Sequence, residues 1–111
     1  MEISWKDFEK VDIRVGTIIE VLDFPEARIP AYKMQIDFGP ELGIKKTSAQ
    51  ITKRYTKSEL LNRQIVAVVN FPKKQIANLM SECLVLGAVG NENDIVLLNP
   101  GFKVENGLRI G

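Results

Sequence analysis

Residues 12–22 read Asp-Ile-Arg-Val-Gly-Thr-Ile-Ile-Glu-Val-Leu, and their pattern indicates the fold class. Apolar side chains recur at every second position from Val11 to Val21, with Thr17 as the one interruption. Alternation with a period of two is typical of a strand with one buried face. Gly16 lies near the centre, where a glycine usually marks a bulge or a sharp coil. The sequence therefore predicts a long strand that bends, as a small closed barrel requires.

The rest of the chain holds shorter strand patterns separated by turn residues. Alternation or short apolar runs predict strands over 32–38, 44–49, 65–69, 82–89 and 94–98. The connection Phe24–Pro30 contains two prolines, and Phe71–Lys74 is predicted as a loop. Glycine and proline at 39–43 predict a turn, and glycine and asparagine predict turns at 90–93 and at 99–101.

Two short helices are predicted from their N-terminal caps. Thr56 and Glu59 have the spacing of a capping box, in which each side chain satisfies an exposed amide of the other residue. Ser4 and Asp7 have the same spacing at the start of a helix over 4–10. Five or six strands with a helix between the third and the fourth are the arrangement of the OB-fold. We therefore predict a mainly β Greek-key barrel of five strands, with short N- and C-terminal extensions.

Composition limits the function classes. The chain has 111 residues, of which 45% are hydrophobic and 26% charged, so one globular domain over 1–111 is expected. It has no histidine and one cysteine, Cys83, which excludes histidine-based catalysis, an intrachain disulfide and a multi-cysteine zinc site. No apolar run reaches the roughly 18 residues of a membrane span, and the acidic N-terminus does not resemble a secretory signal. We expect a cytoplasmic protein without enzyme activity, metal, cofactor or membrane insertion.

The formal net charge of +1 conceals an uneven distribution. Residues 42–81 include eight basic residues and a single acid, a net charge of +7, whereas the flanking parts together have seven basic and thirteen acidic residues, a net charge of −6. Such asymmetry indicates an anionic partner for the central part. The alternative is an ordinary solvated face whose cations are balanced in space by acids from the flanks.

Several short motifs resemble one family when they are taken in order. The opening Asp-Ile-Arg-Val-Gly at 12–16 is followed by Phe-Pro-Glu-Ala at 24–27 and by Ser-Glu-Cys at 81–83. These motifs, with the segments 55–60, 63–70 and 73–76 between them, resemble the tRNA-binding OB domain. That domain is appended to methionyl- and phenylalanyl-tRNA synthetases and also occurs in free-standing tRNA-binding proteins. The resemblance implies a barrel core over about residues 12–89.

The two ends of the chain resemble one branch of this family. Ser-Trp-Lys-Asp-Phe-Glu-Lys-Val at 4–11 and Pro-Gly-Phe-Lys-Val at 100–104 are similar to the ends of CsaA, a small bacterial chaperone linked to protein export. The resemblance implies a homodimer built largely from the extensions 1–11 and 99–111. It also implies binding of unfolded precursor proteins and of the translocation ATPase SecA.

The charge pattern and the resemblance together select candidates for an RNA or anion site. Lysines can contact phosphate groups, which supply most non-specific affinity for nucleic acids, although lysine pairs are also common on solvated surfaces. Polar residues at the family's ligand positions are further candidates, and these are equally suited to closing turns through the backbone. The candidates are Lys45, Lys46, Lys53, Arg54, Asn70, Lys73, Lys74, Ser81 and Glu82.

The connection after the first strand departs from the family pattern. Arg28, Ile29 and Pro30 stand where tRNA-binding members carry a lysine. Phe24, Ile29 and Tyr32 therefore form a candidate apolar site for polypeptide segments, with simple packing over the end of the barrel as the alternative. Cys83 lies in a predicted strand and is interpreted as a small buried residue.

Two functions of different classes follow. The first is a CsaA-like homodimeric chaperone that binds unfolded precursor proteins during export. The alternative is a tRNA-binding module that acts in trans with aminoacyl-tRNA synthetases.

Apolar side chains in the extensions favour a dimer, because free arms with this much apolar area are not expected in water. They are Trp5, Phe8, Phe102, Leu108 and Ile110.

Overall fold

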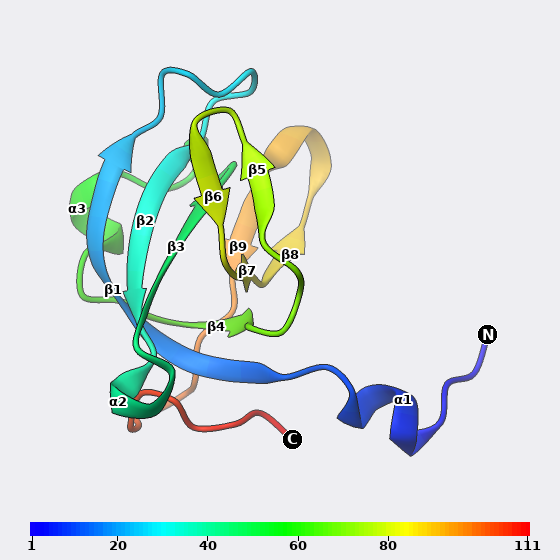
Figure 1. The fold of residues 1–111 in the computed structure, drawn as a ribbon. Helices are drawn as coiled ribbons and strands as arrows, with labels where there is room; N and C mark the ends of the chain where they lie inside the picture. The colour runs from blue at the N-terminus through cyan, green and yellow to red at the C-terminus, as the bar shows by residue number, and fades with distance from the viewer.

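The central strand, β1 (Ile13–Asp23), is long enough to pair with three partners in the computed structural model, which describes residues 1–111. Its first half is antiparallel to β4 (Gln64–Val68), and its second half is antiparallel to β2 (Tyr32–Asp37). The C-terminal tail also joins the first half, since the Gly107 amide donates to the Val15 carbonyl at 2.7 Å. The bend of β1 across the barrel is visible in Figure 1.

The five strands of the main sheet follow the order β3-β2-β1-β4-β7, where β3 is Ile44–Ala49 and β7 is Leu84–Val85. All of its pairings are antiparallel. The short helix α3 (Lys57–Leu60) lies between β3 and β4, with Thr56 as its cap. The nearly closed barrel with a helix after its third strand confirms the predicted OB-fold.

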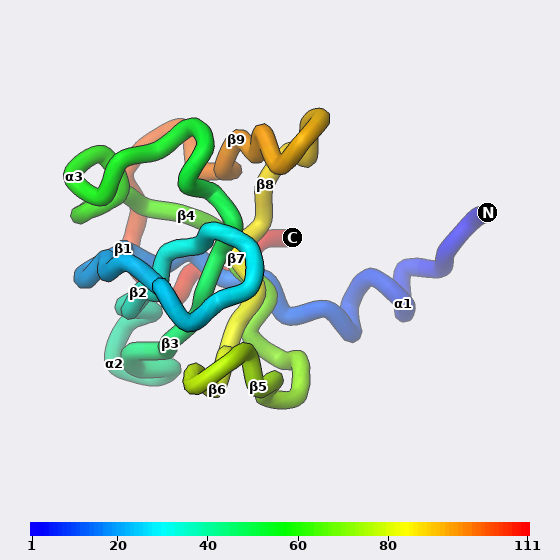
Figure 2. The backbone as a smooth tube through the Cα atoms, turned by 90° about the horizontal axis from the view of Figure 1, so that it is seen from above, coloured from blue at the N-terminus to red at the C-terminus, as the bar shows by residue number.

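The other elements decorate this barrel. They are α1 (Trp5–Glu9), α2 (Gly39–Leu42), β5 (Lys74–Ile76), β6 (Leu79–Ser81), β8 (Gly87–Val89), the 3₁₀ turn η1 (Asn91–Asn93) and β9 (Ile95–Leu97). Two separate hairpins arise from them, β5–β6 and β8–β9. Figure 2 shows α1 standing away from the barrel and the two hairpins on different sides of it.

Three local predictions differ from the structure. The strand predicted over 82–89 is divided into two at Leu86. The amide of Leu86 donates to β4, whereas its carbonyl accepts from the amide of Leu98, so the chain changes its pairing partner there. Lys74 belongs to the β5–β6 hairpin rather than to a loop. A short helix, α2, replaces the simple turn expected at 39–43.

The burial of β1 also differs from the prediction in one position. The register between β1 and β2 shifts between Ile18 and Glu20, which is a β-bulge. Ile18 is therefore fully buried, whereas Ile19 is 39% exposed, so the predicted inward orientation of Ile19 is wrong. The bulge lies after Gly16, not at it, and the pairing of Gly16 with Ile65 of β4 is regular.

Gly16 is needed for close packing instead. A Cβ atom there would lie 2.6 Å from Cγ2 of Ile36 and 2.7 Å from Cδ1 of Phe38. Both neighbours are almost completely buried in the main hydrophobic cluster. The missing side chain therefore allows β1 to cross directly over the core.

The barrel closes between β3 and the segment before β7, where side chains replace part of the strand ladder. The Lys46 amide donates to Oε1 of Glu82 at 2.9 Å, and the Glu82 amide donates to the Lys46 carbonyl at 2.8 Å. Thr47, which is 1% exposed, donates through Oγ1 to the Cys83 carbonyl at 2.8 Å. The Lys46 amide and the nearby Lys73 ammonium lower the pKa of Glu82.

We expect Gly16→Ala to destabilise the protein by about 1–3 kcal/mol, because the added methyl group overpacks a filled core. Gly101→Ala is the control, since a Cβ atom at Gly101 meets nothing within 4 Å. Urea unfolding of both variants measures the effect. Equal stability of the two variants would contradict the close-packing role of Gly16.

The closure by Glu82 predicts a pH-dependent stability. Folding lowers the pKa of this carboxyl below its ordinary 4.5, so its stabilising effect is complete above that value and is lost as the pH falls through the folded-state pKa. We expect Glu82→Gln to lower the free energy of unfolding by about 1 kcal/mol near neutral pH, because the hydrogen bond to a charged acceptor becomes neutral. The difference from the parent protein should shrink as the pH falls below 4.5.

Urea unfolding over a pH series measures this difference. Glu105→Gln is the control, because Glu105 is exposed and forms no ion pair. A Glu82→Gln deficit that is constant over the whole pH series would show that the carboxylate charge does not contribute to closure.

Candidate functional site

One end of the barrel is hollowed into an apolar cavity of about 630 Å³. Hydrophobic residues make up eleven of the fifteen residues that line it. They come from the β1–β2 connection, the end of β3, the β5–β6 hairpin, β7 and β9. Among the lining residues, Ile29 and Leu84 are 46% and 49% exposed. An open cavity of this composition can accept aliphatic side chains from a partner.

The β5–β6 hairpin forms one wall of the apolar cavity and is held by polar contacts at its tip. Ala77 has a φ of 50°, and its carbonyl accepts a hydrogen bond from Nε2 of Gln75 at 2.7 Å. Asn78 donates through Nδ2 to Oε2 of Glu26 at 3.3 Å, which joins the hairpin to the β1–β2 connection. The two walls of the cavity are therefore linked across its rim.

The three predicted peptide-binding residues have different environments. Ile29 lines the apolar cavity. Phe24 is only 4% exposed, and Nζ of Lys33 lies 5.4 Å from its ring centroid. Tyr32 is half-buried and donates from its hydroxyl to the Tyr55 carbonyl at 2.8 Å. Of the three, only Ile29 is placed to touch a ligand in the cavity.

Most residues that line the apolar cavity are not among the peptide-binding residues predicted from the sequence. Ile76, Leu84, Val85 and Ile95 come from elements whose pairing depends on distant parts of the chain. The sequence marks these segments only by the apolar alternation of 82–89 and 94–98. That pattern indicates strands, but it does not show that the strands share a surface. The fold brings these residues together.

Several cations of the basic centre have acidic partners from the flanks. Nε and Nη2 of Arg54 lie 2.8 and 2.9 Å from the two carboxylate oxygens of Asp94. This paired hydrogen bond lowers the pKa of Asp94 and raises that of Arg54. The other pairs are Lys53 with Glu92, Lys57 with Asp23, and Lys73 with Glu82. Half of the eight central cations are thus balanced by acids from elsewhere in the sequence.

The lysine pair 45–46 does not form a single patch, because neighbouring residues of a strand face opposite sides of the sheet. Lys45 pairs across the sheet with the buried Ile36, whereas Lys46 pairs with Gln35 on the outer side. Lys33, two residues before Gln35, shares that outer side. We call Lys33, Gln35 and Lys46 the basic strand face. They line a shallow hollow of about 170 Å³ with Leu79 and with Glu20, which accepts a hydrogen bond from Gln35 at 3.2 Å. Lys74 is exposed on β5 and has no acidic partner.

The polar candidates are bound within the fold. Asn70 accepts from the Asp12 amide at 3.0 Å and donates to the Lys10 carbonyl at 2.6 Å, so it fixes the arm that carries α1. Oγ of Ser81 lies 3.2 Å from Oγ1 of Thr47 and donates to the Cys83 carbonyl. With Glu82 in the barrel closure, all three side chains have structural partners.

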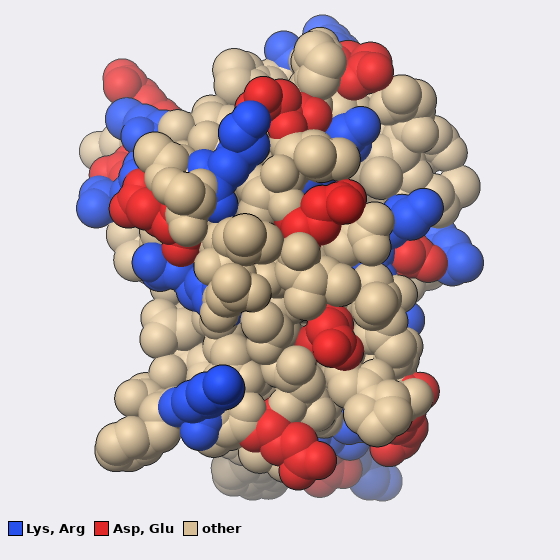
Figure 3. Space-filling model, turned by 90° about the vertical axis from the view of Figure 1, so that its left-hand side faces the viewer, with Lys and Arg blue, Asp and Glu red and all other residues tan.

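Charges of both signs are interleaved on the side of the barrel that carries β1 and α3, as Figure 3 shows. No helix is long and apolar enough to cross a membrane. No group of three or more cysteine and acidic side chains is arranged as a metal site.

Burial raises the pKa of Cys83 to about 11, so this thiol, which is 6% exposed, stays protonated at neutral pH.

Sequence comparisons place the barrel in a family. Residues 13–109 match the model of a putative tRNA-binding domain. The methionine–tRNA ligases of Thermococcus onnurineus and Porphyromonas gingivalis are 36% and 30% identical over 97% and 98% of the chain. The chain spans only 14% and 16% of the length of these two ligases.

Comparison with solved structures extends the similarity to both ends of the chain. The chaperone CsaA from Bacillus anthracis is 50% identical and covers 100% of both chains with a TM-score of 0.95. The CsaA chaperone protein from Picrophilus torridus is 55% identical, with 99% of this chain and 100% of that one covered and a TM-score of 0.93. The chain therefore belongs to the tRNA-binding domain family and is, within it, of the CsaA type.

Proposed function

We propose that this protein is a homodimeric chaperone that binds unfolded precursor polypeptides through the apolar cavity. The observation that carries this proposal is the cavity itself, an open hollow of about 630 Å³ with a largely aliphatic lining. Folded proteins bury their aliphatic side chains, so such a cavity selects chains that have not yet folded. The names of the CsaA structures support the same class of function.

Aliphatic burial accounts for affinity without sequence specificity. Full burial of one leucine or isoleucine side chain contributes roughly 1.5–3 kcal/mol. The exposed side chains of Ile29 and Leu84 and the half-buried Ile76 can cover such a side chain without a fixed polar contact. The proposed ligand is therefore any extended segment with exposed aliphatic residues.

The backbone of β7 supports binding of an extended segment. The amide of Leu86 donates to the Val66 carbonyl, so by strand alternation the amide and carbonyl of Val85 point away from β4. β7 lies at the end of the main sheet, with β4 as its paired strand. Because Val85 lines the apolar cavity, a client chain can use these groups as an added strand would.

The N-terminal arm supports the dimer. The helix α1 has only five residues, and Trp5 and Ile3 are 81% and 67% exposed. These residues, with Phe8, line a hollow of about 530 Å³ beside the C-terminus. A helix of this length is not stable without packing. We propose that a second copy of the chain covers it, and that the dimer meets precursors and SecA in the cytoplasm before export.

The second candidate function is binding of tRNA by the basic strand face. The family match favours it, and Lys33 and Lys46 form no ion pair, since Glu20 in the same hollow is hydrogen-bonded to Gln35. Their location on β2 and β3 is the usual ligand face of OB barrels. In this second proposal the protein binds tRNA as a separate module that acts in trans with aminoacyl-tRNA synthetases.

Ile29→Asp should lower the affinity for a reduced, alkylated and therefore permanently unfolded protein by at least about tenfold, because a carboxylate replaces buried aliphatic area. Fluorescence anisotropy of the labelled polypeptide measures the affinity. Leu61→Asp is the matched control, since Leu61 has the same 46% exposure as Ile29 but lies outside the cavity. Equal losses in the two variants would contradict the cavity as the site.

The same titration distinguishes tRNA binding. Polypeptide affinity should persist at high salt, whereas tRNA affinity should fall with a logarithmic slope of about −0.7 to −0.9 per phosphate contact. The double change Lys33→Glu with Lys46→Glu should remove tRNA binding, and Lys6→Glu with Lys10→Glu should not. Tight tRNA binding at physiological salt, without any affinity for the unfolded chain, would establish the second candidate in place of the first.

The dimer is tested by Trp5→Ala. The parent protein should sediment at twice the 12.5 kDa of one chain, and the variant should shift toward the monomer at the same micromolar concentration. Val89→Ala is the control, since Val89 is 80% exposed but lies on the β8–β9 hairpin. A parent protein that is monomeric at micromolar concentration would refute the dimer.

A further inference from the structure

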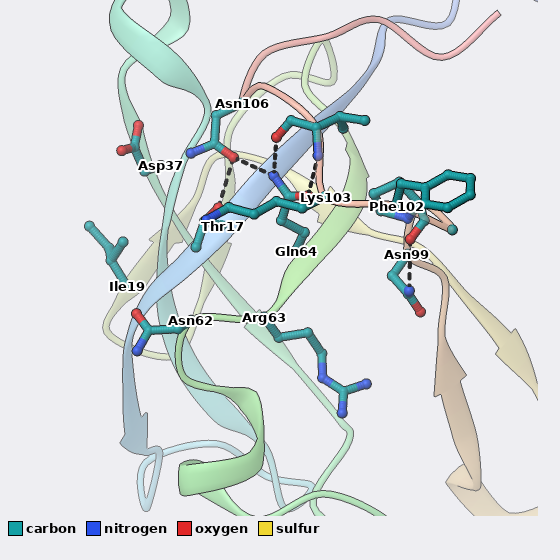
Figure 4. A pocket seen from close by; sticks show the side chains of 13 residues that line it. Thr17, Ile19, Asp37, Asn62, Arg63, Gln64, Asn99, Phe102, Lys103 and Asn106 are labelled. Carbon is teal, nitrogen blue, oxygen red and sulfur yellow. Dashed lines mark hydrogen bonds between the residues drawn. The ribbon is translucent and has the colours of Figure 1, made fainter.

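A second cavity, of about 780 Å³, lies between β1, the start of β4 and the C-terminal tail. It differs from the apolar cavity in chemistry, since only three of its thirteen lining residues are hydrophobic. Figure 4 shows Ile19, Asp37 and Asn62 along one side of the opening and Arg63, Asn99 and Phe102 along the other. We call it the polar cavity.

The floor of the polar cavity is fixed by hydrogen bonds. Oδ1 of Asn106 accepts from Oγ1 of Thr17 at 2.8 Å and from Nε2 of Gln64 at 3.1 Å. Gln64 also bonds in both directions to the backbone of Val104, at 2.7 and 3.1 Å. Because Oδ1 of Asn106 is used, its Nδ2 group is left as a donor without an acceptor. The floor is therefore rigid and still able to donate.

Two cations at the polar cavity have no carboxylate partner. Six basic residues of the chain form ion pairs, and neither Arg63 nor Lys103 is among them. Arg63 is oriented by the ring of Tyr55, whose centroid lies 5.1 Å from Cζ of the guanidinium. Asp37 is the single acid of the lining, and its Oδ1 accepts from the Gly39 amide at 2.8 Å. The lining thus carries two cations against one acid and attracts an anion.

An exposed aromatic ring completes the polar cavity. Phe102 is 86% exposed, although phenylalanine is normally buried. It is followed in the sequence by Lys103, so the same segment of the C-terminal tail supplies an exposed ring and an unpaired cation to the lining. An aromatic platform of this kind stacks nucleobases, and stacking contributes about 1–3 kcal/mol per base.

We propose that the polar cavity binds a nucleoside phosphate, with its base on Phe102, its phosphate near Arg63 and Lys103, and its polar edges on the amide side chains of Asn62, Asn99 and Asn106. The site lies apart from the basic strand face and the apolar cavity, and shares no lining residue with either. Free nucleotide and a nucleotide within single-stranded RNA present the same chemistry.

The experiment uses the full-length protein labelled with ¹⁵N and titrated with AMP, adenosine, inorganic phosphate and hexa-adenylate RNA. AMP should shift the side-chain amide signals of Asn62, Gln64, Asn99 and Asn106 and should bind more tightly than adenosine or phosphate alone. Tighter binding of hexa-adenylate than of AMP at the same signals would support RNA as the source. Tighter binding of AMP would support the free nucleotide.

Phe102→Ala and Lys103→Glu should each lower the affinity for AMP by about tenfold or more. Phe71→Ala and Lys6→Glu are the matched controls, because Phe71 is 55% exposed and Lys6 is exposed, and both lie outside the polar cavity. These controls should change the affinity by less than about twofold.

Three outcomes would overturn the proposal. They are unchanged amide signals with millimolar AMP and hexa-adenylate, shifts confined to the basic strand face, and equal affinity of Phe102→Ala and Lys103→Glu with the parent protein. Dissociation of a dimer by Phe102→Ala, measured by sedimentation, would also overturn it, because Phe102 would then be an interface residue.

Discussion

The structure depends on the contact between the backbone of Gly16 and the buried side chains of Ile36 and Phe38. A Cβ atom at this point of β1 would lie within 2.8 Å of both side chains, so only glycine lets β1 cross the core at this height. Because β1 crosses there, its two halves face different neighbours, and one strand can pair with β2, β4 and the C-terminal tail. The floor of the polar cavity, between Thr17 and Asn106, follows from that third pairing.

Folding changes the meaning of the charge pattern. The basic centre is one block in the sequence, but Asp94 and Glu92 after the barrel neutralise Arg54 and Lys53, and Glu82 neutralises Lys73. Strand alternation then separates neighbouring lysines onto opposite sides of β3. Of the four cations of the basic centre that form no ion pair, Lys46 lies on the basic strand face and Arg63 at the polar cavity, whereas Lys45 and Lys74 lie elsewhere. The charge pattern of the sequence therefore predicts a larger anion-binding surface than the folded protein has.

The features that could be predicted from the sequence are those that depend on residues close together in the chain. Both capping boxes, at Ser4 and Thr56, form as their spacing requires, and β3 has its predicted bounds. The β5–β6 hairpin was missed because its turn uses Ala77 at positive φ without any glycine to mark it. The bulge that turns Ile19 outward carries no local signal either. The walls of the apolar cavity come from strands brought together only by barrel closure, so alternation could identify the strands but not their common surface.

The two cavities differ because different additions to the same barrel build them. The five strands provide a closed core, and the lining of the apolar cavity is completed by the β5–β6 and β8–β9 hairpins, whose contributions are aliphatic. The polar cavity is completed by the C-terminal tail, which contributes Asn99, Phe102, Lys103 and Asn106. Neither addition is needed to close the sheet order β3-β2-β1-β4-β7. Binding chemistry can therefore change in one addition while the barrel and the other cavity stay as they are.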